Sequence, residues 1–421
     1  MAISNQQNIQ NKKAFNIDEI RSNFPCLNQN INGKRLAFLD TAASAQKPES
    51  VIKAIEKVYR AEYANIHRGL YSLSEISTSN FEETRKVIAN FINAESEKEI
   101  IFTRNATEGI NLVAYSYGQK NLKAGDEIII SEMEHHANIV PWQELCKHTG
   151  AILRIVKINE DGDIDLSFYK KALNAKTKIV ALSYMSNVLG TINPVSEIIH
   201  ETRKFNPEIK ILLDACQAIV HLKINVQNLD CDFLVFSGHK LYGPNSVGIL
   251  YGKYEILDQM TPYQTGGEMI ENVSFLNTSF AKPPLKFEAG TPAISEVIAF
   301  KEAIFYLEQF DTKEIHNHET EIFTYAYEEI SKLNNYTILG KPKKRAALIS
   351  FNHKTAHPND LGMILNNHGV AIRSGHLCAQ PLMELLNITA TARASFGIYT
   401  NKQDIDQLIE GLKKVDLLFR D

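Results

Sequence analysis

The sequence of 421 residues lacks several features that would assign it to a specialised class. It contains no apolar run that approaches the roughly 18 residues a membrane-spanning helix needs. Lys and Arg number 45 and Asp and Glu 49, so there is no basic excess to attract a nucleic-acid backbone. We therefore expect a protein that binds neither membranes nor nucleic acids.

Cysteine is scarce as well, with five residues at wide spacings. An odd number of scattered cysteines predicts neither a disulfide framework nor a zinc site. The first 16 residues are rich in Gln and Asn, contain no apolar core and have no Arg, so we expect neither a secretory signal nor a transit peptide. These features predict a reduced, soluble protein of the cytoplasm.

What is present is an ordinary balance of 44% hydrophobic and 22% charged residues, without internal repeats. This balance excludes a disordered or collagen-like chain. The length suits two or three domains, or one large α/β domain with a smaller companion.

Short apolar runs alternate with helical patterns over the first three hundred residues, and this alternation predicts an α/β layered fold. Nearly continuous apolar runs are typical of strands buried on both faces of a parallel sheet. The predicted strands span residues 100–103, 127–131, 152–155, 179–183, 210–213 and 233–236. Helical patterns include residues 109–117, 142–148 and 196–205, and a short helix is expected at 17–23.

After about residue 291 the pattern changes. A helical stretch begins at residues 295–308 and continues to about 333. Strand-like runs follow at 346–351 and 370–373, with helical patterns up to the end. This part predicts a second, smaller α+β domain.

Two predicted strands end in residues that suit chemistry. The first ends in Asp214, with Gln217 close behind, and the second ends in a Ser-Gly-His-Lys turn that contains Lys240. Ligands of open α/β sheets bind at the carboxyl ends of strands. A lysine there can form a Schiff base, and a carboxylate can keep the ring nitrogen of pyridoxal phosphate (PLP) protonated. Either residue alone fits a helix cap or a solvated lysine; the pair favours a PLP site.

Two other segments suit the remainder of such a site. Residues 102–111 predict a strand, a turn and a helix start, where Thr107 either caps the helix or helps to bind a phosphate group. His135 and His136 follow another strand, and one of them could stack on a cofactor ring. We do not expect metal, because adjacent side chains of an extended segment point to opposite faces and no carboxylate cluster accompanies them.

One cysteine stands apart from the others. Cys378 lies in a Gly/His loop five residues after Arg373, where a thiol can act as a nucleophile. A single loop cysteine is more often inert, so this role stays open on the residues alone. We expect the other four cysteines, including Cys216, to serve packing.

Long motifs of this chain occur in the order of a known family. They include Phe-Leu-Asp-Thr-Ala-Ala-Ser-Ala-Gln-Lys-Pro at 38–48, Asn-Ile-His-Arg-Gly at 65–69, Thr-Glu-Gly-Ile-Asn at 107–111, Glu-His-His-Ala-Asn at 134–138, Ser-Asn-Val-Leu-Gly at 186–190, the turn 237–244, Phe-Glu-Ala-Gly-Thr-Pro at 287–292 and Arg-Ala-Ser at 393–395. The chain resembles the SufS-type (group II) cysteine desulfurases, in the class V aminotransferase branch of fold type I PLP enzymes. The resemblance covers nearly everything after residue 17.

The resemblance implies a large PLP-binding domain at 32–295 with a mostly parallel seven-stranded sheet. Residues 1–31 and 296–421 would form the small domain that carries the active-site cysteine loop. It also implies a homodimer. For the cofactor, it implies a Schiff base with Lys240, ring stacking by His135, ring contacts by Asp214 and Gln217, and phosphate contacts by Ala106, Thr107, Ser237, His239 and, from the partner subunit, Thr291.

For the substrate, the resemblance implies L-cysteine held by His67, Asn187, Arg373 and Arg393. Lys240 would also move protons, and Cys378 would take the sulfur as a persulfide. The product would be L-alanine, and a SufE- or SufU-type acceptor would carry the sulfur to iron–sulfur cluster assembly. The alternative is a selenocysteine lyase. Leu377 and Ala106 depart from the residues that are common in the family at these positions, which are His and Thr.

Overall fold

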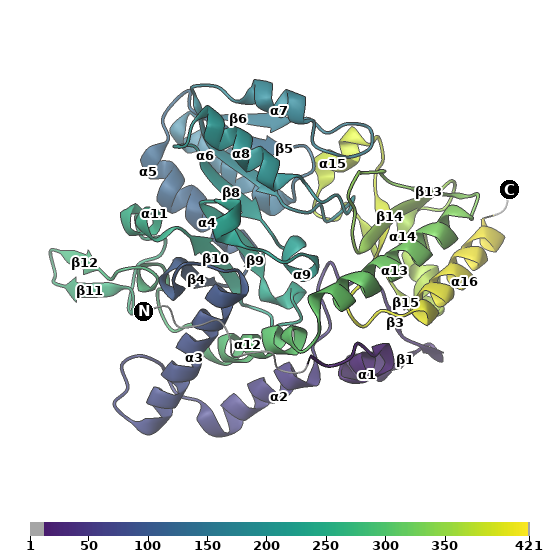
Figure 1. Ribbon diagram of the computed structural model, residues 1–421, viewed down its shortest axis with the longest axis horizontal. Helices are drawn as coiled ribbons and strands as arrows, with labels where there is room; N and C mark the ends of the chain where they lie inside the picture. Colours follow the sequence, from purple (N-terminus) through teal and green to yellow (C-terminus); the bar gives the residue numbers. More distant parts are fainter. Residues whose placement is uncertain (1–11, 420–421) are drawn as a thin grey trace.

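The computed structural model describes residues 12–419, which form a large mostly parallel sheet and a smaller antiparallel sheet, each with its own helices (Figure 1). The large sheet has the strand order β4-β10-β9-β8-β7-β5-β6. Only β10 runs antiparallel to its neighbours in this sheet. Its strands are β4 (Ile100–Thr103), β5 (Glu127–Ser131), β6 (Ile152–Val156), β7 (Thr177–Ser183), β8 (Lys210–Asp214), β9 (Phe233–Ser237) and β10 (Gly248–Gly252).

All six strands predicted from apolar runs are present, within two residues at each end. The sequence pattern missed β10, a five-residue strand that begins and ends with glycine. It also overstated the burial of β6, where Ile152 and Ile155 are exposed because this strand lies at the sheet edge.

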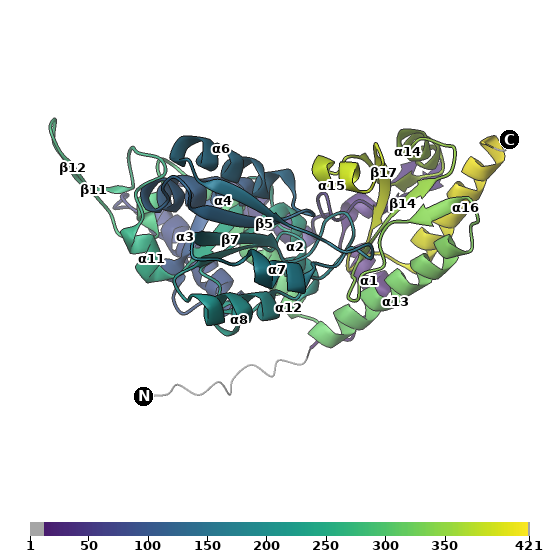
Figure 2. The ribbon, with the colours of Figure 1, turned by 90° about the horizontal axis from the view of Figure 1, so that it is seen from above.

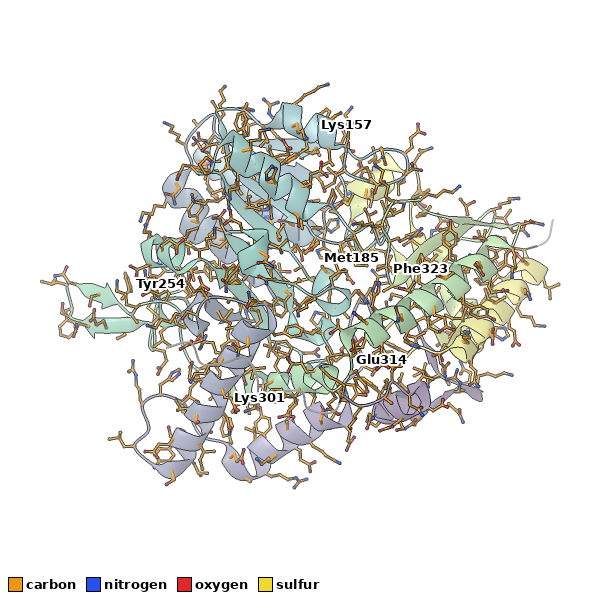
Figure 3. The ribbon with its side chains drawn as sticks, viewed as in Figure 1. Lys157, Met185, Tyr254, Lys301, Glu314 and Phe323 are labelled. Atoms are coloured by element: carbon orange, nitrogen blue, oxygen red, sulfur yellow. The ribbon has the colours of Figure 1, made fainter. Side chains whose placement is uncertain are left out.

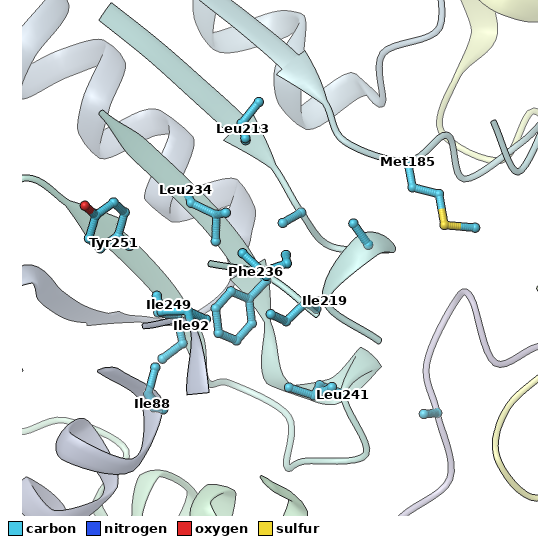
Figure 4. Packing of buried hydrophobic residues seen from close by; sticks show 14 of the residues in the cluster. Ile88, Ile92, Met185, Leu213, Ile219, Leu234, Phe236, Leu241, Ile249 and Tyr251 are labelled. Carbon is cyan, nitrogen blue, oxygen red and sulfur yellow. The ribbon is translucent and has the colours of Figure 1, made fainter. Parts of the chain in front are cut away.

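Helices cover both faces of the large sheet (Figure 2). One face packs on α4 (Ala106–Val113), α6 (Val140–Thr149) and α11 (Tyr254–Gln259). The other packs on α2 (Glu49–Lys57), α3 (Ser72–Phe91), α8 (Val195–Phe205) and α12 (Ile294–Glu308). On this second face, Phe236 of β9 lies beside Ile219 and Ile249 (Figure 4). Packing on both faces holds the carboxyl ends of the central strands rigidly in place.

The smaller sheet has the order β13-β14-β17-β16 and is antiparallel throughout. Its strands are β13 (Tyr336–Ile338), β14 (Leu348–His353), β16 (Arg373–Gly375) and β17 (Thr391–Ser395). Three helices pack on it, α13 (Thr312–Ser331), α14 (Pro358–Asn367) and α16 (Lys402–Leu418). A parallel pair, β3 (Ala37–Phe38) with β15 (Val370–Ala371), adjoins it.

The expected continuous helix over 295–333 is two helices, α12 and α13. The chain breaks where Asp311 caps α13 by accepting a hydrogen bond from the Lys313 N–H. The predicted fold class is confirmed. The exact division at residues 32–295 stays a prediction, and we note that α12 packs against α2 and α3 of the large sheet's layer.

The remaining elements are short. They are α1 (Ile17–Ser22), α5 (Gln119–Asn121), α7 (Leu166–Ala172), α9 (Ala218–His221), α10 (Val226–Leu229), α15 (Gln380–Leu385), β1 (Asn30–Ile31), β2 (Lys34–Arg35), β11 (Ile270–Val273) and β12 (Thr278–Phe280). The β11–β12 hairpin projects far from the body (Figure 2), with Phe275 and Leu276 fully exposed at its tip. Between residues 12 and 419, no helix combines the length and apolar character needed to span a bilayer.

Candidate active site

A cavity of about 560 Å³ opens where the carboxyl ends of β7, β8 and β9 face β16 and β17. Met185, one of its lining residues, lies near the middle of the molecule (Figure 3). The cavity brings together most of the predicted site residues, namely Ala106, Thr107, His135, Asn187, Asp214, Gln217, Ser237, His239, Lys240, Arg373, Cys378 and Arg393. Residues from both sheets therefore share one site.

One end of the cavity is the amino terminus of α4. Asn105 caps this helix by accepting a hydrogen bond from the Glu108 N–H at 2.9 Å, so Thr107 is not the cap and lies in the first turn. The Ala106 N–H donates to Ser237 Oγ at 2.9 Å, which ties the helix start to the end of β9. Gly248 leaves room for this approach, since a Cβ there would lie 2.4 Å from the Asn105 Cα. Such a helix start suits an anion.

The cavity also contains Asp214, which is 7% exposed at the end of β8. Its Oδ1 accepts a hydrogen bond from the Cys216 N–H at 3.0 Å, while Gln217 Nε2 donates to the Ala42 carbonyl at 2.8 Å. Burial and the neighbouring Asp214 raise the pKa of Cys216 to about 12. Its thiol therefore stays protonated, in agreement with a packing role.

His135 and His239 are both held neutral. Burial, followed by the charge of Lys240, lowers the pKa of each ring to about 4. His135 Nδ1 accepts a hydrogen bond from the Ala137 N–H at 3.1 Å, so the ring carries its proton on Nε2. A neutral, fixed imidazole is suited to stacking on a flat ring.

A buried carboxylate anchors the turn that carries His135. Glu134 accepts hydrogen bonds from Ser131, from Asn138 and from both the N–H and the hydroxyl of Ser183. Asn138 in turn accepts from Trp142 Nε1 at 2.8 Å. Burial raises the pKa of Glu134. Because every partner is on or near the large sheet, the turn is fixed to that sheet.

The wall formed by the small sheet presents Arg393, which is 2% exposed on β17. Its Nη1 donates to the Asn187 carbonyl at 2.8 Å, and Nη2 lies 3.3 Å from Asp40 Oδ1. Burial lowers its pKa to about 10, so it remains charged at neutral pH. Within the described residues its Nε has no hydrogen-bond partner. A buried, charged and unpartnered donor beside a cavity suits a carboxylate ligand.

Asp40 was not predicted from the sequence as a site residue. It accepts hydrogen bonds from Arg373 at 3.0–3.2 Å as well as from Arg393. Its position within the motif at 38–48 was visible, but a single carboxylate after a short strand carries no signal of its two partners 333 and 353 residues away.

Cys378 lies on the exposed side of the cavity, in a loop with an unusual backbone. Leu377 and Cys378 both adopt positive φ angles, 53° and 55°, which side chains other than glycine rarely adopt. Asn187 Nδ2 donates to the Leu377 carbonyl at 2.8 Å. His136, which was not among the predicted site residues, contacts the same loop.

Two predicted residues, His67 and Thr291, do not line this cavity within one chain. His67 Nε2 lies 3.1 Å from Glu82 Oε1, and its Nδ1 lies 3.6 Å from Glu268 Oε2. Thr291 lines a separate cavity of about 480 Å³, and the preceding Gly290 N–H donates to the Gly267 carbonyl at 3.0 Å. Both residues therefore lie near the same loop, at 266–268. Their predicted roles stay predictions.

Comparisons with known proteins agree with this architecture. The model of the aminotransferase class-V family matches residues 37–408, and the chain belongs to this family. It is 47% identical over 405 residues to a probable cysteine desulfurase of Halalkalibacterium halodurans, covering 96% of this chain and 99% of that protein. It is 45% identical to a cysteine desulfurase of Cronobacter sakazakii, with coverage of 96% and 99%. The crystal structure of the Escherichia coli cysteine desulfurase CsdA (S-sulfonic acid) superimposes with a TM-score of 0.89 at 35% identity, over 96% of this chain and all of that one.

Proposed function

We propose that this chain is a PLP-dependent cysteine desulfurase that converts L-cysteine to L-alanine and takes the sulfur onto Cys378. The observation that carries the proposal is the shared cavity. Lys240 and Asp214 come from the large sheet, whereas Arg393 and Cys378 come from the small-sheet side. The names of relatives at 45–47% identity support the same reaction.

The residues present fit PLP. The amino terminus of α4 with Ser237 suits the phosphate group, Asp214 suits the ring nitrogen, and the neutral ring of His135 suits stacking. In this assignment Lys240 would hold the cofactor as a Schiff base, and Gln217, His239, Thr107 and Ala106 would complete its contacts. When bound, PLP supplies an electron sink for the carbon atoms of the substrate.

The chain's own residues then act on L-cysteine in turn. Arg393, with Asn187 beside it, binds the substrate carboxylate and fixes its orientation. With the substrate bound, the Lys240 amine would remove the Cα proton and later return a proton. Cys378 Sγ forms a bond to the substrate sulfur as the Cβ–S bond breaks. The electron pair of the broken bond stays with the carbon fragment, which is protonated and leaves as alanine.

A homodimer would give a role to His67 and Thr291, the two predicted site residues that do not line the cavity of their own chain. His67 and Thr291 lie near one loop and outside the cavity of their own chain, and the hairpin beside them exposes Phe275 and Leu276. Large exposed apolar side chains at a projecting tip favour contact with another protein surface. We infer that a second copy completes each cavity with this region, Thr291 reaching the phosphate and His67 the substrate pocket.

The finer assignment follows the sequence motif around Cys378. The Arg-x-Gly-His-x-Cys-Ala pattern beginning at Arg373 favours the group II, SufS-type enzymes of the cytoplasm. Such an enzyme passes its persulfide sulfur to an acceptor of the SufE or SufU type, and from there to iron–sulfur clusters. The exposure of Cys378 is compatible with delivery to a protein. A selenocysteine lyase is less favoured, because direct release of selenium needs no thiol relay.

The test is alanine release from L-cysteine by the wild type and by Cys378→Ala, with and without a reducing agent. Alanine from the wild type and not from the variant supports transfer to Cys378. Cys26→Ala is the matched control, because this half-buried thiol lies outside the cavity. Equal alanine from the wild type and Cys378→Ala would overturn the persulfide proposal and favour the lyase.

A further inference from the structure

His136 holds the loop of Cys378 at two points. Its backbone N–H donates to the Cys378 carbonyl at 2.7 Å. Its Nε2 accepts a hydrogen bond from the Gln380 N–H at 2.9 Å. The two contacts lie at Cys378 and Gln380, on either side of Ala379. Both come from the large-sheet side of the cavity.

The histidine is itself firmly placed. It follows His135 in the turn that Glu134 and Asn138 fix to the large sheet. The two rings have different partners, because His135 Nδ1 accepts a hydrogen bond from the Ala137 N–H and His136 Nε2 accepts one from the Gln380 N–H. His135 lines the cofactor side, and His136 meets the loop.

The loop needs outside support because its backbone is unfavourable. Leu377 and Cys378 are consecutive residues in the left-handed region, which L-residues other than glycine rarely adopt. Such conformations persist when surrounding contacts hold them. Asn187 supplies one contact, to the Leu377 carbonyl, and His136 supplies two.

We propose that His136 is a positioning residue that clamps the Cys378 loop in its left-handed conformation and so sets where the thiol lies in the cavity. Opening of the Gln380–His136 hydrogen bond frees the loop to turn Cys378 outward. The clamp stands on the contacts alone, whereas its consequence for sulfur transfer rests on the proposed function.

Gln380 offers a direct readout. It is the first residue of α15, and the first four N–H groups of a helix have no partner within the helix. Protection of this amide from hydrogen exchange therefore reports the bond to His136. In the wild-type holoenzyme without substrate, we expect the Gln380 amide to be protected; a freely exchanging amide would overturn the clamp.

Two variants of His136 test the hydrogen bond from the Gln380 N–H: one removes the accepting atom and the other restores it. In His136→Ala, we expect exchange at Gln380 to rise roughly fivefold to tenfold, as the loss of one hydrogen bond implies. We expect the rate of Cys378 alkylation by iodoacetamide to rise by a similar factor, because the freed loop turns the thiol outward. His136→Gln places an amide oxygen near the position of Nε2 and is expected to restore both values. His148→Ala, on the exposed surface of α6, is the matched control.

Steady-state kinetics distinguish a positioning role of His136 from a general loss of structure in the variant. In His136→Ala we expect kcat for alanine release to fall about fivefold to tenfold while KM for L-cysteine stays within about twofold, because Arg393 and Asn187 are retained. Unchanged exchange and alkylation in His136→Ala, or no rescue by His136→Gln, would overturn the proposal. A wild type that releases no alanine would overturn the proposed function instead, since exchange and alkylation are measured without substrate.

Discussion

The two walls of the cavity are built in different ways. On the large-sheet wall, Asp214 and Ser237 end buried parallel strands, and the packing of the sheet itself sets their positions. On the opposite wall, Cys378 lies in an exposed loop with left-handed backbone, held by Asn187 and His136 from across the cavity. The packing of the sheet therefore holds the large-sheet wall in place. The Cys378 loop is held only as long as its hydrogen bonds to Asn187 and His136 remain.

This difference matches what each wall is proposed to do. A cofactor that stays bound needs fixed partners, whereas a thiol that receives sulfur and delivers it elsewhere needs a position that can change. Asp40 connects a fixed and an exposed part of the site, because it pairs with both the buried Arg393 and the exposed Arg373. The following changes test each part of the comparison.

The largest effect is expected on the rigid wall. Lys240→Ala should abolish the absorption band expected of a lysine-bound cofactor and lower alanine release by roughly 1,000-fold or more, because the group proposed to move the substrate proton is gone. Absorption spectra and alanine assays measure both. Lys282→Ala, which alters an exposed lysine paired with Asp258, should leave both unchanged. A yellow protein with normal spectra in Lys240→Ala would contradict the site.

Arg393→Lys should lower kcat/KM for L-cysteine roughly 10- to 100-fold, mainly through KM. Lysine keeps the charge but not the planar fork, and it leaves the Asn187 carbonyl and Asp40 with one donor in place of the guanidinium. Steady-state kinetics measure the effect. An unchanged KM would mean that the substrate carboxylate binds elsewhere.

Asp40→Asn should lower kcat/KM about tenfold, because both arginines lose their charged partner. Arg373→Ala sharpens this result, since it removes only the exposed partner and leaves the buried pair intact. We expect its effect to be the smaller of the two, as exposed ion pairs contribute little. The reverse order in steady-state kinetics would show that Arg373 is the main carboxylate ligand.

The smallest effect concerns acid stability. The pKa of His135 is about 4 in the folded chain, against an ordinary 6.5, because burial and Lys240 disfavour its charged form. Between these values the unfolded chain binds the extra proton and the folded chain does not, so the free energy of unfolding falls as pH drops from 6.5 towards 4.

Urea unfolding of the chain freed of cofactor, at pH 7.5 and pH 5, measures this loss. His135→Asn removes one of the two histidines whose pKa is lowered to about 4, the other being His239, so its unfolding midpoint should drop less than that of the wild type over the same interval. Equal drops in the two proteins would show that His135 does not contribute to the pH dependence.

The sequence was most informative where a local pattern determines the outcome. Buried strands such as β8 and β9 are recognisable as apolar runs, and the position of each strand then places the residue at its end. Contacts between distant segments left no such trace. Neither the two bonds of His136 nor the two arginine partners of Asp40 are visible in spacing, because they depend on how the sheets face each other.

The expectation that His135 and His136 point to opposite faces assumed an extended segment, whereas the structure places His136 in a short 3-10 turn and both residues line the cavity. The sequence could not show that His136 bonds to the Cys378 loop, because this contact depends on how the two sheets face each other.

The protonated thiol of Cys216 limits where sulfur can move within the cavity. Two cysteines line one space, yet exchange between a thiol and a persulfide requires a thiolate as the attacking group. With a pKa of about 12, Cys216 supplies almost none at neutral pH. If Cys378 carries the sulfur as proposed, that sulfur is not expected to migrate inward to Cys216. In the proposed function its open route is outward, because Cys378 lies on the exposed side of the cavity.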